Sequence, residues 1–436
     1  MPIIQSLLDT DYYKLTMGQF TWRRYPDIPV KYAFKNRTAG VPLAEIIPEK
    51  ILHEEFDWTR TLRFQNDELE YLRNIRKSGG ERVFCDGYLD FLRNFQLPEY
   101  QLERIGDTYK IEFPGKWQEV IYWETPALAI VNELYNSYIY KNFGFKLEPE
   151  KIKDYLDNDF LQLLIGKKSS YCSFSDSVLE GIKRLNKKVE ILKLYPEIKI
   201  IEFGTRRRYS RWHQEYVLQK LLEQIPDQII GTSNVYLAKK YGIPAMGTIA
   251  HECFMIMSGI MHESDEQIRS SHNKVLREWW DEYEYDLSVA LTDTYGSDFF
   301  FQDFTPEQAK MWKGLREDSG DPIASGEKAI AFYKNFGINL MEKLIVFSDG
   351  LDVHSIVKIY NHFRGRIQMA FGWGTNLTND LGIRALSLVI KAVEACGHRL
   401  VKLSNNFAKA IGKPEGIKRF KRIFGYTATL NEQCRY

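Results

Sequence analysis

Polar residues directly follow seven short apolar runs in the C-terminal part of this 436-residue chain. They include glycines, hydroxyl side chains, arginines, aspartates and one histidine. Glycine-rich turns leave backbone N–H groups free to bind phosphate oxygens, and arginine matches the geometry of carboxylates and phosphates. Aspartate suits ribose hydroxyls or a magnesium ion held through pyrophosphate. The pattern predicts a ligand that carries phosphates, a sugar and a second anionic group.

Single motifs from this set are less informative than their combination. The arginine run at 206–208, taken by itself, would be as typical of a solvated charge run as of a binding site. His251 and Glu252 resemble the start of a zinc-binding HExxH motif, but Met255 stands where the second histidine would be. The Gly-Trp-Gly sequence at 372–374 lacks the third glycine of a dinucleotide-binding turn. A zinc protease and a Rossmann-type site are therefore not expected.

A repeated alternation of strands and helices would bring these residues together. The apolar runs lie at 199–203, 228–230, 245–249, 287–291, 314–315, 344–347 and 367–371. Segments with helical periodicity lie between them, at 212–224, 265–283, 322–336 and 353–363. Such alternation predicts βα units around a parallel sheet, and seven runs favour a barrel, complete or open. In a β/α barrel the loops after the strands form the active site, which is where the polar residues fall.

The N-terminal part of the chain has a different, mixed α+β pattern. It predicts a strand at 30–35, a hairpin at 100–113, a strand at 119–123 and a long helix at 125–143. A charged, linker-like stretch follows at 146–159. We therefore expect an α/β protein in three parts: an N-terminal α+β domain (1–145), an irregular, TIM-like β/α barrel (146–385) and a C-terminal segment that returns to the N-terminal domain (386–436).

Composition excludes several classes of protein. The 59 basic and 58 acidic side chains nearly cancel, so a dedicated nucleic-acid-binding protein is not expected. No apolar stretch approaches the length of a membrane span, and the N-terminus does not resemble a signal peptide. The five cysteines are scattered and odd in number, which favours a reducing cytoplasm.

Six motifs occur in the order that is typical of one enzyme family. They are LLDTDYYK (7–14), EFGTRRR (202–208), GTSN (231–234), GTIAHE (247–252), LREDSGD (315–321) and FSDGLD (347–352). The chain resembles the nicotinate phosphoribosyltransferase family essentially end to end. The resemblance implies synthesis of nicotinate mononucleotide and pyrophosphate from nicotinate and phosphoribosyl pyrophosphate, the first step of NAD synthesis from nicotinate. It also implies Mg²⁺, ATP as co-substrate, and a homodimer whose sites each borrow the N-terminal tyrosine region from the partner.

The resemblance also implies roles for individual residues. His251 corresponds to the histidine that ATP phosphorylates, and together with Arg316 and Asp318 it forms the expected catalytic group. The expected nicotinate contacts are Tyr13, Phe203, Ser233, Thr248 and Arg316, with Tyr13 and Phe203 stacking on the ring and Arg316 meeting the carboxylate. The expected contacts to phosphoribosyl pyrophosphate are Arg206, Asp318, Asp349, Gly374, Thr375 and Lys402, the last of them across the dimer. The choice of Tyr13 over Tyr12 rests on its place before Lys14.

Ser233 bears on the choice between two pyridines. Relatives that use nicotinamide carry an acidic residue after the corresponding Gly-Thr, where it can accept from the amide N–H. An acid there would repel a carboxylate, whereas the Ser233 hydroxyl can donate to one. Ser233 therefore favours nicotinate.

The expected chemistry needs no general base, because the pyridine nitrogen of nicotinate is unprotonated at neutral pH. The difficulty lies in the charge of a developing oxocarbenium ion and a departing pyrophosphate. We therefore expect catalysis by positioning and electrostatic stabilisation, with Mg²⁺ carried by the pyrophosphate and no metal ligands from the protein. Phosphorylation of His251 is expected to improve phosphoribosyl pyrophosphate binding and to couple ATP hydrolysis to product formation.

Three other functions remain open at this stage. A nicotinamide-specific transferase would need an amide-binding group in place of Ser233. A sugar-phosphate isomerase or aldolase on a TIM barrel would usually need a lysine or glutamate base at a strand end. No such lysine is present, and Glu202 and Glu252 are the only adjacent glutamates. A non-catalytic binding protein of the same fold would be expected to lack residues around His251, Arg316 or Asp318, yet all three are present.

Overall fold

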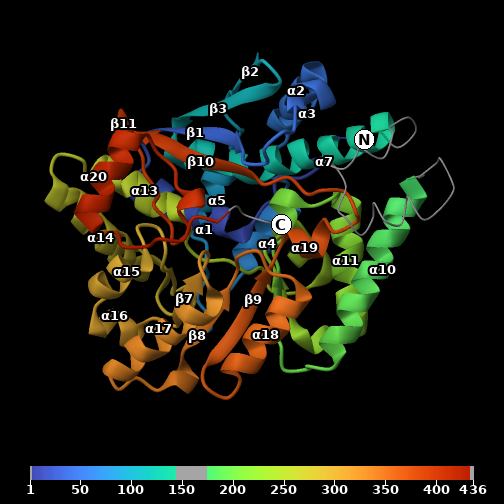
Figure 1. The fold of residues 1–436 in the computed structure, drawn as a ribbon. Coiled ribbons are helices and arrows are strands. Elements are labelled where there is room, and N and C mark those ends of the chain that lie inside the picture. The colour runs from blue at the N-terminus through green and yellow to red at the C-terminus, as the bar shows by residue number, and fades with distance from the viewer. Residues whose placement is uncertain (1, 144–173, 433–436) are drawn as a thin grey trace.

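Two β-sheets lie one above the other in the computed structural model, which describes residues 2–143 and 174–432 (Figure 1). The upper sheet is antiparallel and has five strands. In sheet order these are β11 (His398–Arg399), β10 (Leu388–Ala395), β1 (Pro29–Asn36), β3 (Thr108–Lys116) and β2 (Gln101–Ile105). The expected strand at 30–35 and hairpin at 100–113 are both present in it.

The centre of the upper sheet is made by strands from opposite ends of the chain. β1 pairs with β10 from Val30 opposite Ala395 to Asn36 opposite Leu388, with one register shift between Lys31 and Tyr32. The sheet is therefore complete only with strands that follow the second sheet in the chain. One consequence is that residues after 386 lie over the carboxyl ends of the lower strands.

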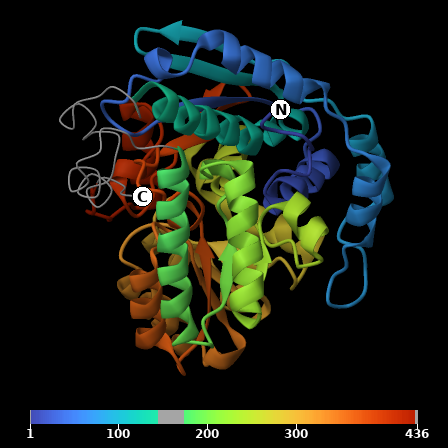
Figure 2. The same cartoon turned by 90° about the vertical axis from the view of Figure 1, so that its right-hand side faces the viewer.

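Helices fill the space around the upper sheet. The N-terminal ones are α1 (Tyr12–Arg24), α2 (Leu43–Ile46), α3 (Glu49–Thr61), α4 (Asn66–Asn74), α5 (Asp86–Arg93), α6 (Trp117–Val120) and α7 (Glu124–Phe143). Figure 2 shows α7 running beneath the sheet, where it packs against β10. The long helix expected at 125–143 is α7. The strand expected at 119–123 is wrong: this segment is α6 and a short 3₁₀ turn (Ile121–Trp123), and its side chains are buried on successive positions instead of alternating.

The lower sheet is parallel and has six strands. In sheet order these are β5 (Ile229–Thr232), β4 (Ile200–Glu202), β9 (Gln368–Trp373), β8 (Leu344–Phe347), β7 (Gly314–Glu317) and β6 (Val289–Leu291). Six of the seven expected apolar runs form these strands. The seventh, 245–249, makes a single parallel bridge from Ala245 to Thr232, so its backbone ladder is short.

The parallel sheet curves around an apolar interior. Ile201 of β4, Val289 of β6, Val346 of β8 and Ala370 of β9 form one buried cluster, although β4 and β6 are far apart in the strand order. Residues 245–248 lie between the edge strands, because Met246 N–H donates to Thr232 and the Thr248 hydroxyl donates to the Val289 carbonyl, 3.1 Å away. The arrangement is the α/β architecture with an N-terminal domain that the sequence predicts.

The remaining helices cover the outside of the parallel sheet and its ends. They are α10 (Phe174–Lys193), α11 (Arg211–Gln224), α12 (Val235–Tyr241), α13 (His251–Ile260), α14 (Asp265–Tyr283), α15 (Ser297–Asp303), α16 (Pro306–Met311), α17 (Pro322–Asn335), α18 (Val353–Phe363), α19 (Thr375–Thr378) and α20 (Pro414–Phe424). α10 and α11 run side by side (Figure 2). The charged stretch expected at 146–159 lies outside the described residues. Among those that are described, no helix combines the length and apolar character that a membrane crossing requires.

Candidate active site

A pocket lies between the carboxyl ends of the parallel strands and the antiparallel sheet above them. The strand ends contribute Phe203 after β4, Asp318 after β7, Ser348 and Asp349 after β8, and Gly374 after β9. The part above contributes Tyr13, Arg37, Val389, Lys391, Lys402 and Lys409. Residues separated by hundreds of positions therefore share one cavity, as the strand-end motifs predict.

Two aromatic rings form a slot in this pocket. Tyr13, near the start of α1, lies parallel to Phe203, with ring centroids 6.3 Å apart and an interplanar angle of 13°. A flat ring between them needs about 7 Å, since carbon atoms pack at about 3.5 Å, so a small opening of the slot would admit a pyridine. Tyr12 instead meets Phe84 edge to face, with centroids 6.0 Å apart. The structure therefore places Tyr13, and not Tyr12, at the slot.

Both rings of the slot belong to the same chain. The expectation that each site borrows the tyrosine from a partner chain is therefore wrong for this residue in this structure. The physical reason is that α1 packs tightly against α13: the Ala250 N–H donates to the Met17 sulfur, 3.4 Å away, and a Cβ on Gly247 would come within 2.9 Å of the Tyr13 nitrogen. Lys402, expected to reach across a dimer, also lines the pocket of its own chain.

Arg316 lies with Phe203 at the floor of the pocket. Phe203, Arg316 and Val346 line both this pocket and a second cavity inside the curved sheet. In the part of the chain that the structure describes, the Arg316 guanidinium makes no side-chain hydrogen bond or ion pair, and its buried Nε has no partner. A buried donor without a partner costs about 1–3 kcal/mol. A guanidinium without a protein partner next to an aromatic slot has the chemistry to bind the carboxylate of a flat aromatic acid.

Arg206 differs from Arg316 in its charge balance. Its Nε lies 3.0 Å from Asp11 and its Nη1 lies 3.4 Å from Glu124, both of them buried acids. The guanidinium also stands 5.5 Å from the centroid of the Tyr13 ring. Arg206 is therefore compensated by the protein and supports one wall of the slot, where cation–π attraction holds Tyr13.

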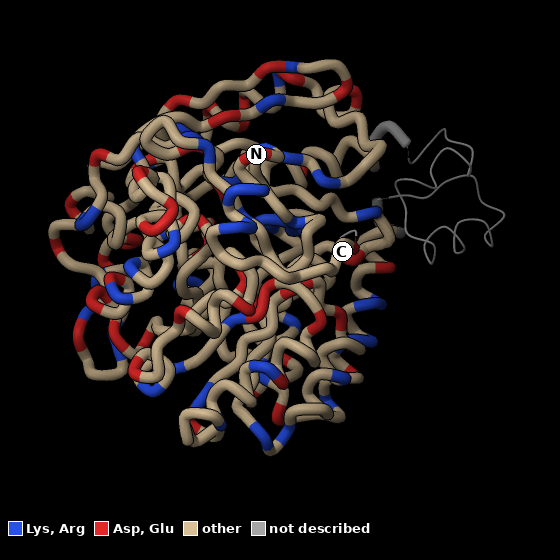
Figure 3. The backbone as a smooth tube through the Cα atoms, turned by 60° about the vertical axis from the view of Figure 1, so that its left-hand side comes forward, with Lys and Arg blue, Asp and Glu red and all other residues tan. Residues whose placement is uncertain are grey.

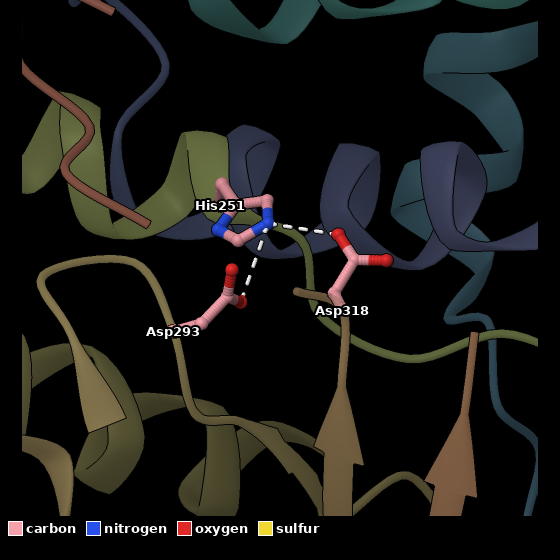
Figure 4. A group of neighbouring side chains, drawn as sticks. All are labelled: His251, Asp293 and Asp318. Carbon is pink, nitrogen blue, oxygen red and sulfur yellow. Dashed lines mark hydrogen bonds and ion pairs between the residues drawn. The ribbon is translucent and has the colours of Figure 1, made fainter. Parts of the chain in front are cut away.

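His251 begins α13 and faces two carboxylates. Its Nε2 lies 3.0 Å from Asp318 and 3.6 Å from Asp293 (Figure 4). Its Nδ1 lies 3.0 Å from the Thr294 hydroxyl. Burial lowers the pKa of His251 to about 4, and the charge of Lys402 acts in the same direction. The imidazole is therefore neutral at physiological pH, which leaves one ring nitrogen with a lone pair available for covalent chemistry.

Asp293 is a site residue that the expected set did not contain. Burial raises the pKa of this carboxyl, but His251 and Lys402 outweigh burial and hold the pKa below its usual value. Hydroxyls of Ser319 and Ser404 donate to Oδ2, while buried Oδ1 has no hydrogen-bond partner. Its place directly after β6 is the available signal, because Asp318 after β7 and Asp349 after β8 occupy equivalent positions and belong to the expected set.

Three side chains at the edge of the pocket could hold a divalent cation. Ligand atoms of His251, Asp293 and Asp318 lie within 4.8 Å of one another. Carboxylate oxygens are the protein ligands that Mg²⁺ prefers, and the unpartnered Oδ1 of Asp293 is an acceptor without a donor. The two carboxylates therefore suit Mg²⁺, whereas the expectation from the sequence is that pyrophosphate carries the ion without ligands from the protein.

Cations from the upper part of the molecule face these acids. Lys409 pairs with Asp349 and donates to the Asp318 carbonyl at 3.1 Å, and Lys402 lies 3.8 Å from Asp293. Burial lowers the pKa of Lys402 to about 8. Lys391 on β10 lies 2.8 Å from Glu124. At the pocket, the acids thus come from the strand ends below and most of the cations from above. Over the described backbone as a whole, acidic and basic residues are interspersed (Figure 3).

The structure brings most of the expected site residues together, with two exceptions. Those that line the pocket are Tyr13, Phe203, Arg206, His251, Arg316, Asp318, Asp349, Gly374, Thr375 and Lys402. Ser233 and Thr248 do not line it. The Ser233 hydroxyl is buried and donates to Asp11 at 2.6 Å, and Thr248 donates to the Leu287 carbonyl at 2.7 Å. The structure therefore does not place the Ser233 hydroxyl where it could contact a carboxylate ligand in the pocket.

Comparisons with known proteins agree on one family. The model of the nicotinate phosphoribosyltransferase (NAPRTase) family matches residues 198–428, and the model of its N-terminal domain matches residues 8–132. A nicotinate phosphoribosyltransferase structure from Porphyromonas gingivalis is 29% identical, with a TM-score of 0.80 over 97% of this chain and 100% of that one. One from Vibrio cholerae is 29% identical (TM-score 0.80, 98% and 95%), and a putative one from Saccharomyces cerevisiae is 27% identical (TM-score 0.80, 98% and 99%).

Proposed function

This chain belongs to the nicotinate phosphoribosyltransferase family, and we propose that it joins nicotinate to the ribose of phosphoribosyl pyrophosphate with ATP hydrolysis coupled through His251. The observation that carries the choice of nicotinate is the unpaired Arg316 at the floor of an aromatic slot. A carboxylate would satisfy that guanidinium, whereas a neutral amide would leave its charge unpaired. Mispairing of this kind is the usual source of strong discrimination between close analogues.

The pocket residues divide among the parts of the substrates. The pyridine ring enters between Tyr13 and Phe203, with its carboxylate on Arg316. Asp318 and Asp349, which line the same pocket, are the acceptors that we assign to the ribose hydroxyls. The phosphates meet the cations above, Lys391, Lys402 and Lys409, and the turn at Gly374 and Thr375.

The transfer step itself requires little proton chemistry. The nicotinate nitrogen attacks the anomeric carbon with its lone pair, the new N–C bond forms, and pyrophosphate departs with the electrons of the C–O bond. The protein holds the two reactants in line and stabilises charge, which is the largest contribution to many such reactions. Mg²⁺, held by Asp293 and Asp318, would neutralise negative charge on the leaving group.

His251 is suited to accept a phosphoryl group because its imidazole is neutral. A ring nitrogen attacks the γ-phosphorus of ATP, the N–P bond forms, and ADP departs with the electrons of the broken P–O bond. Water later cleaves the N–P bond and releases phosphate. The added charge of about −1.5 to −2 lies beside Lys402 and the bound substrate, so phosphorylation can alter substrate affinity.

The test incubates purified protein with nicotinate, phosphoribosyl pyrophosphate and Mg²⁺, with and without ATP. We expect nicotinate mononucleotide in both reactions, more of it with ATP, and acid-labile phosphate on the protein. His251→Ala should abolish the labelling and the stimulation by ATP. Full stimulation in that variant would refute the role of His251, and preference for nicotinamide in a competition between the two pyridines would refute the choice of substrate.

A further inference from the structure

A buried lysine joins the two chemically active regions of the pocket. Lys14 is fully buried, and its ammonium lies 2.6 Å from Glu124 and 2.7 Å from Glu252, which are also buried. Its chain neighbour Tyr13 forms one wall of the slot, and the chain neighbour of Glu252 is His251. The Lys14–Glu252 ion pair therefore ties the residue next to the slot to the residue next to the phosphate acceptor.

The two residues lie in the first turns of adjacent helices. Tyr13 and Lys14 belong to the first turn of α1, and His251 and Glu252 are the first two residues of α13. The contact of the Ala250 N–H with Met17 keeps the two helix starts in register. A shift at one helix start must therefore be accommodated at the other, because both are packed without space between them.

Glu124 extends the connection to the walls of the slot. Besides Lys14 it pairs with Lys391 at 2.8 Å and with Arg206 at 3.4 Å, and the Tyr13 hydroxyl donates to it at 3.4 Å. The connection thus runs from Glu252 through Lys14 and Glu124 to the slot. Each link is a charge-assisted contact in a buried environment, where an added charge is screened weakly.

Stability alone does not account for this cluster. Replacing a buried ion pair with apolar or neutral groups of similar size is often neutral or stabilising, whereas removing one partner costs about 3–5 kcal/mol. In some proteins a buried pair of this kind fixes one particular arrangement. Here that arrangement is the relative position of the slot and the phosphate acceptor.

We propose that Lys14 is a positioning residue that couples the phosphorylation state of His251 to the affinity of the slot for nicotinate. The inference rests on the proposed function, since it needs a phosphoryl group on His251. New negative charge there repels Glu252, which strengthens its contact with Lys14 and shifts Glu124 relative to Arg206 and Lys391. Coupling between two sites in proteins is commonly about 5- to 150-fold in affinity.

The experiment measures the ratio of the nicotinate KM without ATP to that with ATP, in the wild type and in Lys14→Met/Glu252→Gln. The double variant removes both charges together, so it leaves no unpaired buried charge at this pair and should fold. Because the readout is a ratio within each protein, a uniform change in activity cancels. Lys343→Met is the matched control, since the Lys343 ammonium is also buried but bonds backbone carbonyls at Lys310 and Trp312, outside the pocket.

We expect a ratio of about tenfold in the wild type and in the control, and a ratio near one in the double variant. Lys14→Arg keeps the charge and should restore part of the ratio. A merely structural role for Lys14 would not require the ratio to follow the charge. An unchanged ratio in a folded double variant that still carries acid-labile phosphate overturns the inference. Absence of acid-labile phosphate on the wild type instead refutes the ATP coupling of the proposed function, and the inference with it.

Discussion

Replacement of Arg316 by methionine tests the assignment of the slot floor most directly. Two parallel hydrogen bonds from a guanidinium to a carboxylate contribute about 1.5–3 kcal/mol each. Allowing for the desolvation of both groups, we expect a net loss of about 3–4 kcal/mol, which is a fall of about 10²- to 10³-fold in kcat/KM for nicotinate. For nicotinamide, which offers no carboxylate, the fall should be less than about tenfold.

Arg316→Met should lower activity but raise stability. Arg316 has a buried Nε without a partner, so its removal should raise the free energy of unfolding by about 1 kcal/mol. Arg206→Met is the matched control, because it leaves the buried Asp11 without its ion-pair partner and removes one of three cations around Glu124, so it should lower stability. Steady-state kinetics with both pyridines and urea unfolding of both variants provide the measurements. Equal losses for the two pyridines, or a destabilised Arg316→Met protein, would show the reasoning to be wrong.

Three further predictions concern the slot, a buried histidine and a close approach. Tyr13→Leu should raise the nicotinate KM about tenfold through lost stacking, whereas Tyr12→Leu should leave that KM within about twofold and lower only the urea midpoint. Burial lowers the pKa of His213 to about 4. The neutral imidazole therefore contributes its full stability above the unfolded-state pKa of about 6.5, and this contribution is lost as the pH falls from about 6.5 toward about 4. Unfolding at about pH 7.5 and about pH 5 should therefore differ by about 2 kcal/mol more in the wild type than in His213→Gln, and equal differences would contradict the shift. Gly204→Ala would bring a methyl group within 2.0 Å of a threonine side chain of α19 and should cost about 1–3 kcal/mol, unlike Gly79→Ala, which meets open space.

The parallel strands and the residues after them are predictable from the sequence because their signal is local. An apolar run buried on both faces followed by a polar turn is visible within ten residues, and parallel strands place all their carboxyl ends on one side. The same locality explains the failure at 119–123. A short run of buried aromatic and branched residues is typical of a strand or of a buried helical turn, and periodicity does not separate the two.

The cations above the pocket were largely missed because their signal is not local. Arg37 follows β1, Lys391 lies within β10, and Lys409 lies in the C-terminal segment, yet all three line the pocket. Their position depends on the pairing of β1 with β10, which lie more than 350 residues apart in the sequence, and no short motif predicts that pairing. Lys402 was expected on the resemblance alone, and its neighbour Lys409 had no such support.

The proposed function assigns selectivity for an acid over an amide to Arg316 at the slot floor, and we infer that Ser233 acts on it at a distance. The Ser233 hydroxyl donates to Asp11, Asp11 holds Arg206, and Arg206 stands over the Tyr13 ring. An acid at position 233 would face the buried Asp11 carboxylate before it faced any ligand, and two such groups cannot both remain ionised. The residue after the Gly-Thr turn therefore influences the slot through the balance of charge around Arg206. In the proposed function, direct recognition of the carboxylate is left to Arg316, whose buried Nε has no partner among the described residues.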